Sequence, residues 1–251
     1  MIKSKISAAA GAAAALGAAM MVPAVATAHD TYAFETAQNG DFGVLDLDTG
    51  AFNKCGNSGL TLGGLGVGVT NPLYTAQYHS LSGITTIYTL APSNGALTPV
   101  ETDSISAVGV FGSTKPGSLY ATDFTGELYS INPLNAVATM VGPTHVPMTV
   151  DVGMSTGSST LYLTHKSTLY KIDTKTGHGK KIGAASDSIT AMVMVGGVLY
   201  GATQANPPAL VTLDTTTGAS TPIATISGET TYAYGLAPAP KQKSGTCPAT
   251  P

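Results

Sequence analysis

Three acidic residues precede similar apolar segments in different parts of the chain. They are Asp103 in "TDSISAVGV", Asp187 in "SDSITAMVM" and Glu229 in "GETTYAYGL". If these carboxylates converge on one axis, they could bind a hard cation such as Ca²⁺, which takes several oxygen ligands. Mutual repulsion could instead keep one of them protonated, as acid–base catalysis requires. In the alternative interpretation, each carboxylate accepts hydrogen bonds from the amides of its own turn and lies apart from the others.

A second set of polar residues follows short alternating segments that are predicted to be strands. The set contains Glu35, Tyr78, His79, Asp123, His165 and Gln204. With the three acids, these residues are the candidate ligand-binding residues. His79 and His165 suggest a transition-metal site, but no H-x-H or C-x-x-C spacing supports one, so loop histidines are the simpler interpretation. The chain has no nucleophile elbow, Walker loop or dinucleotide fingerprint, so no catalytic residue is assigned.

The elements that must position these residues come from a sequence repeat. One landmark, a turn position, falls at Gly50, Gly95, Ala136, Gly177 and Gly218, at intervals of 45, 41, 41 and 41 residues. A second landmark, the aromatic residue of an apolar-Tyr pair, falls at Tyr32, Tyr74, Tyr120, Tyr162 and Tyr200. Two landmarks share one period, which lies in the range of propeller blades.

Each repeat is predicted to fold into four short antiparallel strands. The fourth repeat, for example, gives alternating segments at 149–155, 161–165, 169–173 and 180–184. Residues 231–237 match the first strand of a repeat, and residues 31–35 match the second. The predicted fold class is therefore an all-β, five-bladed β-propeller over residues 29–240, closed by the C-terminal strand joining the N-terminal blade.

The turns between the third and fourth strands have a mechanical explanation. Asp173, Asp214 and Asn132 are predicted to accept hydrogen bonds from turn amides, while the glycine supplies the positive φ of the turn. The third repeat replaces this glycine with Ala136, and the second reads "LAPSNG" at 90–95. A different turn conformation is expected at both places.

The recurring phrase LY-x-(I/L)-(D/N)-x-x-x-G, followed by an apolar strand, resembles the blades of the NHL-like and YVTN-like bacterial propeller families. The resemblance covers nearly the whole chain after its first residues. It implies a site at one mouth of the ring, where loops entering the innermost strands meet loops between second and third strands. Such propellers include binders, scaffolds and enzymes, so the resemblance is specific for architecture only.

The first 28 residues are predicted to be a signal peptide. Lys3 and Lys5 precede an apolar run that is too short to prefer spanning a bilayer, and Ala26-Thr27-Ala28 is a small-x-small cleavage pattern. The formal net charge is −3 and the sequence contains no arginine, which argues against nucleic acid or anionic membrane as partners. We expect a secreted or periplasmic protein, monomeric and without a transmembrane segment.

The two cysteines, Cys55 and Cys247, are predicted to form a disulfide in an oxidising compartment, with residues 241–251 as a C-terminal tail.

The leading functional hypothesis is a non-catalytic module that binds an extracellular protein or a small-molecule ligand at one face. The alternative is a divalent-cation-dependent hydrolase or lactonase-like enzyme whose channel mouth is lined by carboxylates. Ca²⁺ is the cation considered, with Asp103, Asp187 and Glu229 as its candidate ligands.

Overall fold

Short segments rich in apolar and β-branched residues build the regular elements of the chain. The computed structural model describes residues 31–69, 72–79, 84–103, 108–148, 152–229, 231–240 and 245–249, and excludes the side chains of 101–103 and 108–110. Within these ranges all regular elements are strands. No helix in the described part of the chain has the length and hydropathy needed to span a bilayer. The predicted signal peptide lies outside the described residues.

Two of the sheets have four strands each. The first, in the order β20-β1-β2-β3, consists of β20 (Ala233–Pro238), β1 (Tyr32–Ala37), β2 (Asp41–Asp46) and β3 (Phe52–Asn57). The second consists of β4 (Gly66–Val67), β5 (Leu73–His79), β6 (Ile84–Leu90) and β7 (Leu97–Asp103). In the first sheet the strands nearest the two chain ends, β1 and β20, pair antiparallel.

The remaining strands form one 12-stranded sheet that contains three antiparallel meanders. The first meander is β8 (Val108–Ser113), β9 (Leu119–Asp123), β10 (Glu127–Ile131) and β11 (Ala138–Pro143). The second is β12 (Val152–Thr156), β13 (Leu161–His165), β14 (Thr168–Ile172) and β15 (Gly179–Ala184). The third is β16 (Ile189–Val195), β17 (Val198–Thr203), β18 (Ala209–Leu213) and β19 (Ser220–Thr225).

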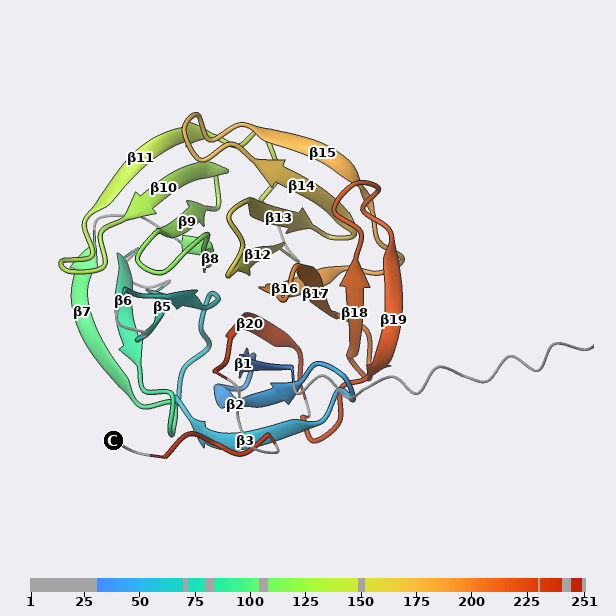
Figure 1. The fold of residues 1–251 in the computed structure, drawn as a ribbon. Helices are drawn as coiled ribbons and strands as arrows, with labels where there is room; N and C mark the ends of the chain where they lie inside the picture. The colour runs from blue at the N-terminus through green and yellow to red at the C-terminus, as the bar shows by residue number, and fades with distance from the viewer. Residues whose placement is uncertain are drawn as a thin grey trace, which may run out of the picture.

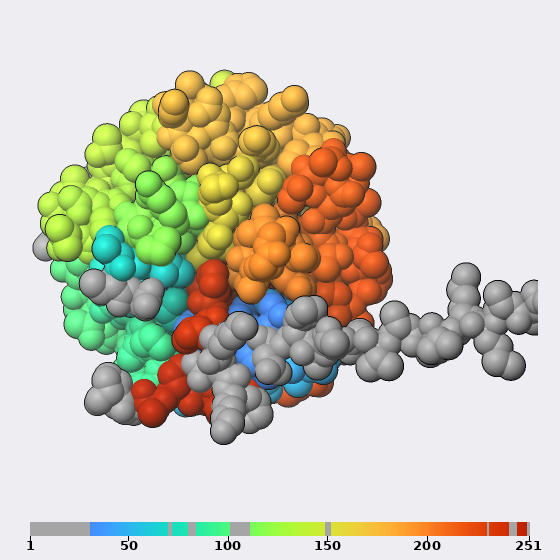
Figure 2. Space-filling model, viewed as in Figure 1, coloured from blue at the N-terminus to red at the C-terminus, as the bar shows by residue number. Residues whose placement is uncertain are grey.

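The sheets are arranged around a common centre, with the first strand of each group innermost (Figure 1). We call β4, β8, β12, β16 and β20 the inner strands. The space-filling view shows successive segments following one another around the molecule, with the red C-terminal segment beside the blue N-terminal one (Figure 2). Apolar cores fill the spaces between neighbouring groups; one of them joins Leu169 of β14 to Ile189 and Met192 of β16.

The inner strands touch one another directly. Strand β12 pairs in parallel with both β8 and β16, and a parallel bridge joins Gly64 to Phe111. Buried hydroxyls add further links, since Thr164 Oγ1 donates to the Ile189 carbonyl at 2.8 Å and Thr190 Oγ1 donates to the Ala233 carbonyl at 2.7 Å. These contacts explain the small residues of the inner strands, because only a residue without a side chain permits so close an approach.

Gly235 on β20 tests this explanation. A Cβ atom added there would lie 2.7 Å from backbone atoms of Gly64 and Leu65. We expect Gly235→Ala to lower the free energy of unfolding by about 1–3 kcal/mol, as overpacking typically does. The matched control is Gly201→Ala, whose Cβ would meet only side-chain methyl groups, at 3.1 Å or more. Chemical denaturation of both variants checks the prediction, and equal stabilities would contradict it.

The strand boundaries of the fourth repeat agree closely with the sequence prediction, but one expectation about the turns was wrong. Ala136 has a φ of 54°, in the same left-handed region as Gly177 at 84° and Gly95 at 74°. The Gly95 amide donates to the Ala91 carbonyl at 2.8 Å, as the Gly177 amide does to the Asp173 carbonyl. The turns of the second and third repeats therefore keep the common conformation, because packing holds the buried Ala136 in it.

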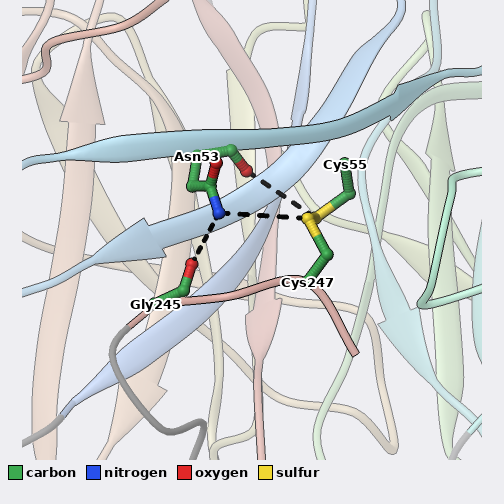
Figure 3. Close-up of a disulfide and its surroundings, with 4 residues drawn as sticks. All are labelled: Asn53, Cys55, Gly245 and Cys247. Atoms are coloured by element: carbon green, nitrogen blue, oxygen red, sulfur yellow. Dashed lines mark hydrogen bonds between the residues drawn. A yellow bond between two sulfur atoms is a disulfide. The ribbon is translucent and has the colours of Figure 1, made fainter. Parts of the chain in front are cut away.

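The predicted disulfide is confirmed and fastens the tail to the outermost strand of the first sheet. Cys55 on β3 is bonded to Cys247, with a Cα–Cα distance of 5.5 Å. Beside it, Asn53 Nδ2 donates to the Gly245 carbonyl at 2.9 Å (Figure 3). The bridge and this hydrogen bond together place residues 245–249 against the sheet that contains both β1 and β20.

Candidate functional site

Two of the predicted site residues, Glu35 and Glu229, form a buried carboxyl pair. Glu35 lies on β1 with none of its surface exposed, and Glu229 lies in the segment that precedes β20. Within the described part of the chain, no donor reaches any of their four carboxylate oxygens. A hydrogen bond between two carboxyl groups therefore needs a proton that the pair itself holds.

The surroundings of the pair favour its protonated form. Burial, together with the hydrogen bond and the charge of Glu229, raises the pKa of Glu35 well above its usual range. Burial and the charge of Asp41 also raise the pKa of Glu229, although the hydrogen bond that it accepts from Glu35 lowers it. The pair therefore resists ionisation, most strongly at Glu35, which has none of its surface exposed.

The alternation of β1 explains the location of the pair. Glu35 shares a strand face with Ala33, which packs in a core with Ala191, Val193 and Ala202 of β16 and β17. Glu35 therefore faces the last meander of the chain, and the segment carrying Glu229 connects that meander to β20. The pair lies where the first and last parts of the chain meet.

Asp41 stands near this pair but is held by other partners. Lys54 Nζ lies 2.6 Å from Asp41 Oδ1, and Asn57 Nδ2 donates to the same oxygen at 2.6 Å. Partial burial opposes ionisation of Asp41, yet the hydrogen bonds from Lys54 and Asn57 hold its pKa below the usual value. Asp41 is consequently a fixed negative charge, which disfavours a second negative charge on the carboxyl pair.

Asp123, another predicted site residue, is engaged by its own turn. Its Oδ1 accepts hydrogen bonds from the backbone and hydroxyl groups of Thr125, at 2.9 and 2.7 Å, and from the Glu127 amide at 3.0 Å. Tyr129 donates its hydroxyl to Oδ2 at 3.3 Å. These contacts organise the turn between β9 and β10.

The remaining predicted residues lie at separate places. Tyr78 makes an edge contact with Phe124, at a ring-centroid distance of 5.7 Å, and His79 Nε2 lies 3.1 Å from Thr86 Oγ1. Asp187 is exposed, and His165 ends β13. The backbone amide of Gln204 donates to the Ser188 carbonyl at 2.9 Å.

The predicted calcium ligands are Asp103, Asp187 and Glu229. The side chain of Asp103 lies outside the described part of the structure. Within that part, no group of three or more His, Cys, Asp or Glu side chains is placed to hold a metal ion.

Two related positions were missed by the sequence-based prediction. Counting three residues from each landmark tyrosine reaches Glu35, Gln77, Asp123, His165 and Thr203. Gln77 Oε1 is buried, and it has no hydrogen-bond partner among the described residues, while Thr203 Oγ1 accepts from the Ala209 amide at 2.9 Å. Both could have been found from the tyrosine spacing, which marks one polar position in each repeat.

A cleft of about 430 Å³ lies elsewhere, at the ends of the inner strands. It is lined by Phe34, Val67, Leu73, Pro92, Ser113, Lys115, Pro116, Gly157, Pro238, Ala239, Pro240 and Pro248. We call it the proline cleft. Ser113 and Pro238 are the last residues of β8 and β20, whereas Glu229 precedes the start of β20. The cleft and Glu229 thus lie at opposite ends of β20, while Glu35, which pairs with Leu236, lies between them. Among the described side chains, none of the predicted site residues lines the cleft.

Comparison with known proteins identifies the fold. One chain of the crystal structure of the nidogen/laminin complex superimposes with a TM-score of 0.53 and 13% sequence identity, over 85% of this chain and 100% of that one. The chain has a β-propeller fold. No protein-family model and no curated protein sequence matches it. The structural similarity is evidence for the fold alone, because the sequence identity is only 13%.

Proposed function

We propose that this propeller is an exported binding module without catalytic activity, and that its ligand occupies the proline cleft. In this proposal the chain forms five blades of four strands. The C-terminal strand β20 completes the N-terminal blade and closes the ring, consistent with its pairing to β1. Residues 1–28 are removed on export, and the mature protein acts as a monomer. The disulfide is compatible with an oxidising compartment.

The proline cleft is the observation that carries this proposal. Its volume and mostly apolar lining are typical of small-molecule sites, which add a few polar groups to fix orientation. Proline side chains lose little conformational entropy on burial, so a proline-lined wall is already organised for a ligand. The disulfide-bonded tail completes this wall, because Pro248 follows Cys247 directly.

The polar groups of the cleft indicate what kind of ligand fits. Lys115 is exposed at the cleft, whereas Ser113, two residues earlier, is buried and its Oγ accepts a hydrogen bond from the Val67 amide at 3.1 Å. A lysine ammonium beside apolar walls favours a molecule with an apolar body and one negative group. We therefore propose an apolar organic anion, free or as the end of a peptide, as the ligand class.

Fluorescence titration with 1-anilinonaphthalene-8-sulfonate, an apolar probe with one negative group, tests the proposal. We expect saturable binding to the native protein. Ala239→Trp, which fills the cleft with an indole, should weaken it by at least about tenfold, equivalent to about 1.4 kcal/mol. Lys115→Gln should weaken binding less, because the apolar contacts remain.

The matched control is Leu134→Trp, at a position that is 87% exposed and does not line the cleft. This variant should bind the probe like the unmodified protein, and near-UV circular dichroism should show that all variants are folded. Equal binding by the Ala239→Trp and Leu134→Trp variants would place the probe outside the cleft and overturn the proposal.

The carboxyl pair is the one feature that favours the alternative, a cation-dependent hydrolase. A protonated Glu35 beside an acceptor has the form of an acid–base pair. Against this, all four carboxylate oxygens are buried, so a substrate could reach them only after the strands move apart. A screen with ester and lactone substrates, with and without Ca²⁺, decides between the two. Activity that the Glu35→Gln variant loses would favour the enzyme.

A further inference from the structure

Two exposed histidines that the proposed function does not use lie close together. His145 lies between β11 and β12, and His178 lies in the turn between β14 and β15. Their ring centroids are 5.5 Å apart and the rings are tilted by 60°. They are separated by most of a repeat in the sequence, so only the packing of neighbouring blades brings them together.

The backbone around both histidines is fixed. His145 has a φ of 56°, a conformation that is uncommon for a residue with a side chain and is retained only where the surroundings enforce it. The adjacent Thr144 is buried, and its carbonyl accepts from the Gly179 amide at 2.9 Å. The His178 carbonyl accepts from the Asp173 amide at 2.9 Å. The first of these bonds joins the two loops and the second closes the turn that carries His178, so the rings are held near each other before any ligand arrives.

The separation of the rings matches that of two imidazoles on one metal ion. With a zinc–nitrogen bond of about 2.0–2.1 Å and a ring nitrogen about 1.2 Å from the ring centre, two imidazoles on a tetrahedral ion have centres roughly 5 Å apart. Within the described part of the chain, no hydrogen bond engages either ring. The ring nitrogens can therefore serve as ligands once small side-chain rotations direct them to a common point.

We propose that His145 and His178 form a binding site for a divalent transition-metal ion of the kind that imidazole prefers, such as Zn²⁺ or Cu²⁺. Among the described residues no third His, Cys, Asp or Glu completes the site. The ion therefore keeps open positions for water or for a ligand from a partner. A polar cleft of about 710 Å³, lined by His178, Asp173 and Lys180 among others, borders the site and gives such a ligand access.

Isothermal titration of the full chain with Zn²⁺ in a non-coordinating buffer tests this site. We expect one ion per chain. Loss of even an outer-shell partner costs about tenfold to a hundredfold in metal affinity, so His145→Ala and His178→Ala should each cost at least as much. Both residues are exposed, so neither change should prevent folding.

His79→Gln is the control for loss of an unrelated imidazole, and it should leave zinc binding unchanged. Imidazole NMR resonances give a second readout, and those of His145 and His178 should be the two that shift when zinc is added. Affinity that survives in either single variant, or a native protein that binds zinc no better than the double variant, would overturn the proposal. The test is independent of the proline cleft, whose probe binding should not respond to either histidine substitution.

Discussion

Replacement of Glu35 by glutamine should make this propeller more stable at pH 8 and reduce the loss of its stability as the pH rises above 5. Glu35 is fully buried, and its hydrogen-bonding partner among the described residues is another carboxyl group, Glu229. Above the ordinary pKa of a glutamate the unfolded chain ionises Glu35 freely, whereas burial and Glu229 oppose that ionisation in the folded chain. Glutamine has no proton to lose and can donate its amide to Glu229 in place of the carboxyl proton.

The direction follows from proton linkage. The pKa of Glu35 in the folded protein lies above its ordinary value of 4.5, so the folded state binds a proton that the unfolded state has released. The contribution of Glu35 to the free energy of unfolding is therefore fully present below the ordinary pKa. It is lost as the pH rises toward the folded pKa, by up to about 1.4 kcal/mol per pH unit for one proton. Asp41, whose charge also raises the pKa of Glu229, adds to the repulsion that ionisation of the pair must overcome.

Urea denaturation at half-unit intervals between pH 4 and pH 9 measures this effect. The unmodified protein should lose stability across the alkaline part of the range, and the Glu35→Gln variant should lose much less. Glu127→Gln is the matched control, since Glu127 lies on β10, in another blade. A Glu35→Gln variant whose curve runs parallel to that of the unmodified protein would show that Glu35 does not hold the proton.

Removal of the disulfide should have the largest effect on stability. The bond between Cys55 and Cys247 spans a sequence separation of 192 residues. For a loop of this length the chain-entropy model gives roughly 5 kcal/mol as an upper figure. The Cys55→Ala/Cys247→Ala variant should therefore unfold at a much lower urea concentration. It should also bind the fluorescent probe more weakly, because Pro248 is no longer held at the cleft.

Reduction of the unmodified protein supplies the control. A reductant should lower its stability to that of the double alanine variant and should leave the variant itself unchanged. A loss below about 1 kcal/mol would mean that other contacts hold the tail, such as the hydrogen bond from Asn53 to the Gly245 carbonyl. In that case the disulfide would not be what fastens the chain end to the first sheet.

The strands could be predicted from the sequence because their signals are local and repeated. The tyrosine and turn landmarks alone give β13 its bounds, Leu161–His165, and place residues 231–237 beside residues 31–35. The turn at Ala136 could not be predicted in this way. Its φ is imposed by packing around a buried methyl group, and a propensity argument based on glycine does not include that packing.

The candidate site was only partly accessible from the sequence. Alignment of the repeats placed Glu35 and Glu229 at the same mouth, but their direct pairing depends on the face of β1 that meets the last meander. The proline cleft was not found, because its lining combines the ends of strands from different repeats with connecting segments and a tail residue next to Cys247, and no motif links them in the sequence. The histidine pair was missed for a similar reason, since His145 and His178 occupy non-equivalent positions in their repeats.

An NMR titration of the ¹⁵N-labelled propeller with the apolar anionic probe locates the ligand on the ring and so tests whether it occupies the proline cleft. We expect the shifted amides to cluster around the proline cleft, at Ser113, Lys115, Gly157 and Ala239. Shifts confined to the opposite mouth, near Glu229 and Tyr78, would contradict the assignment of the binding face.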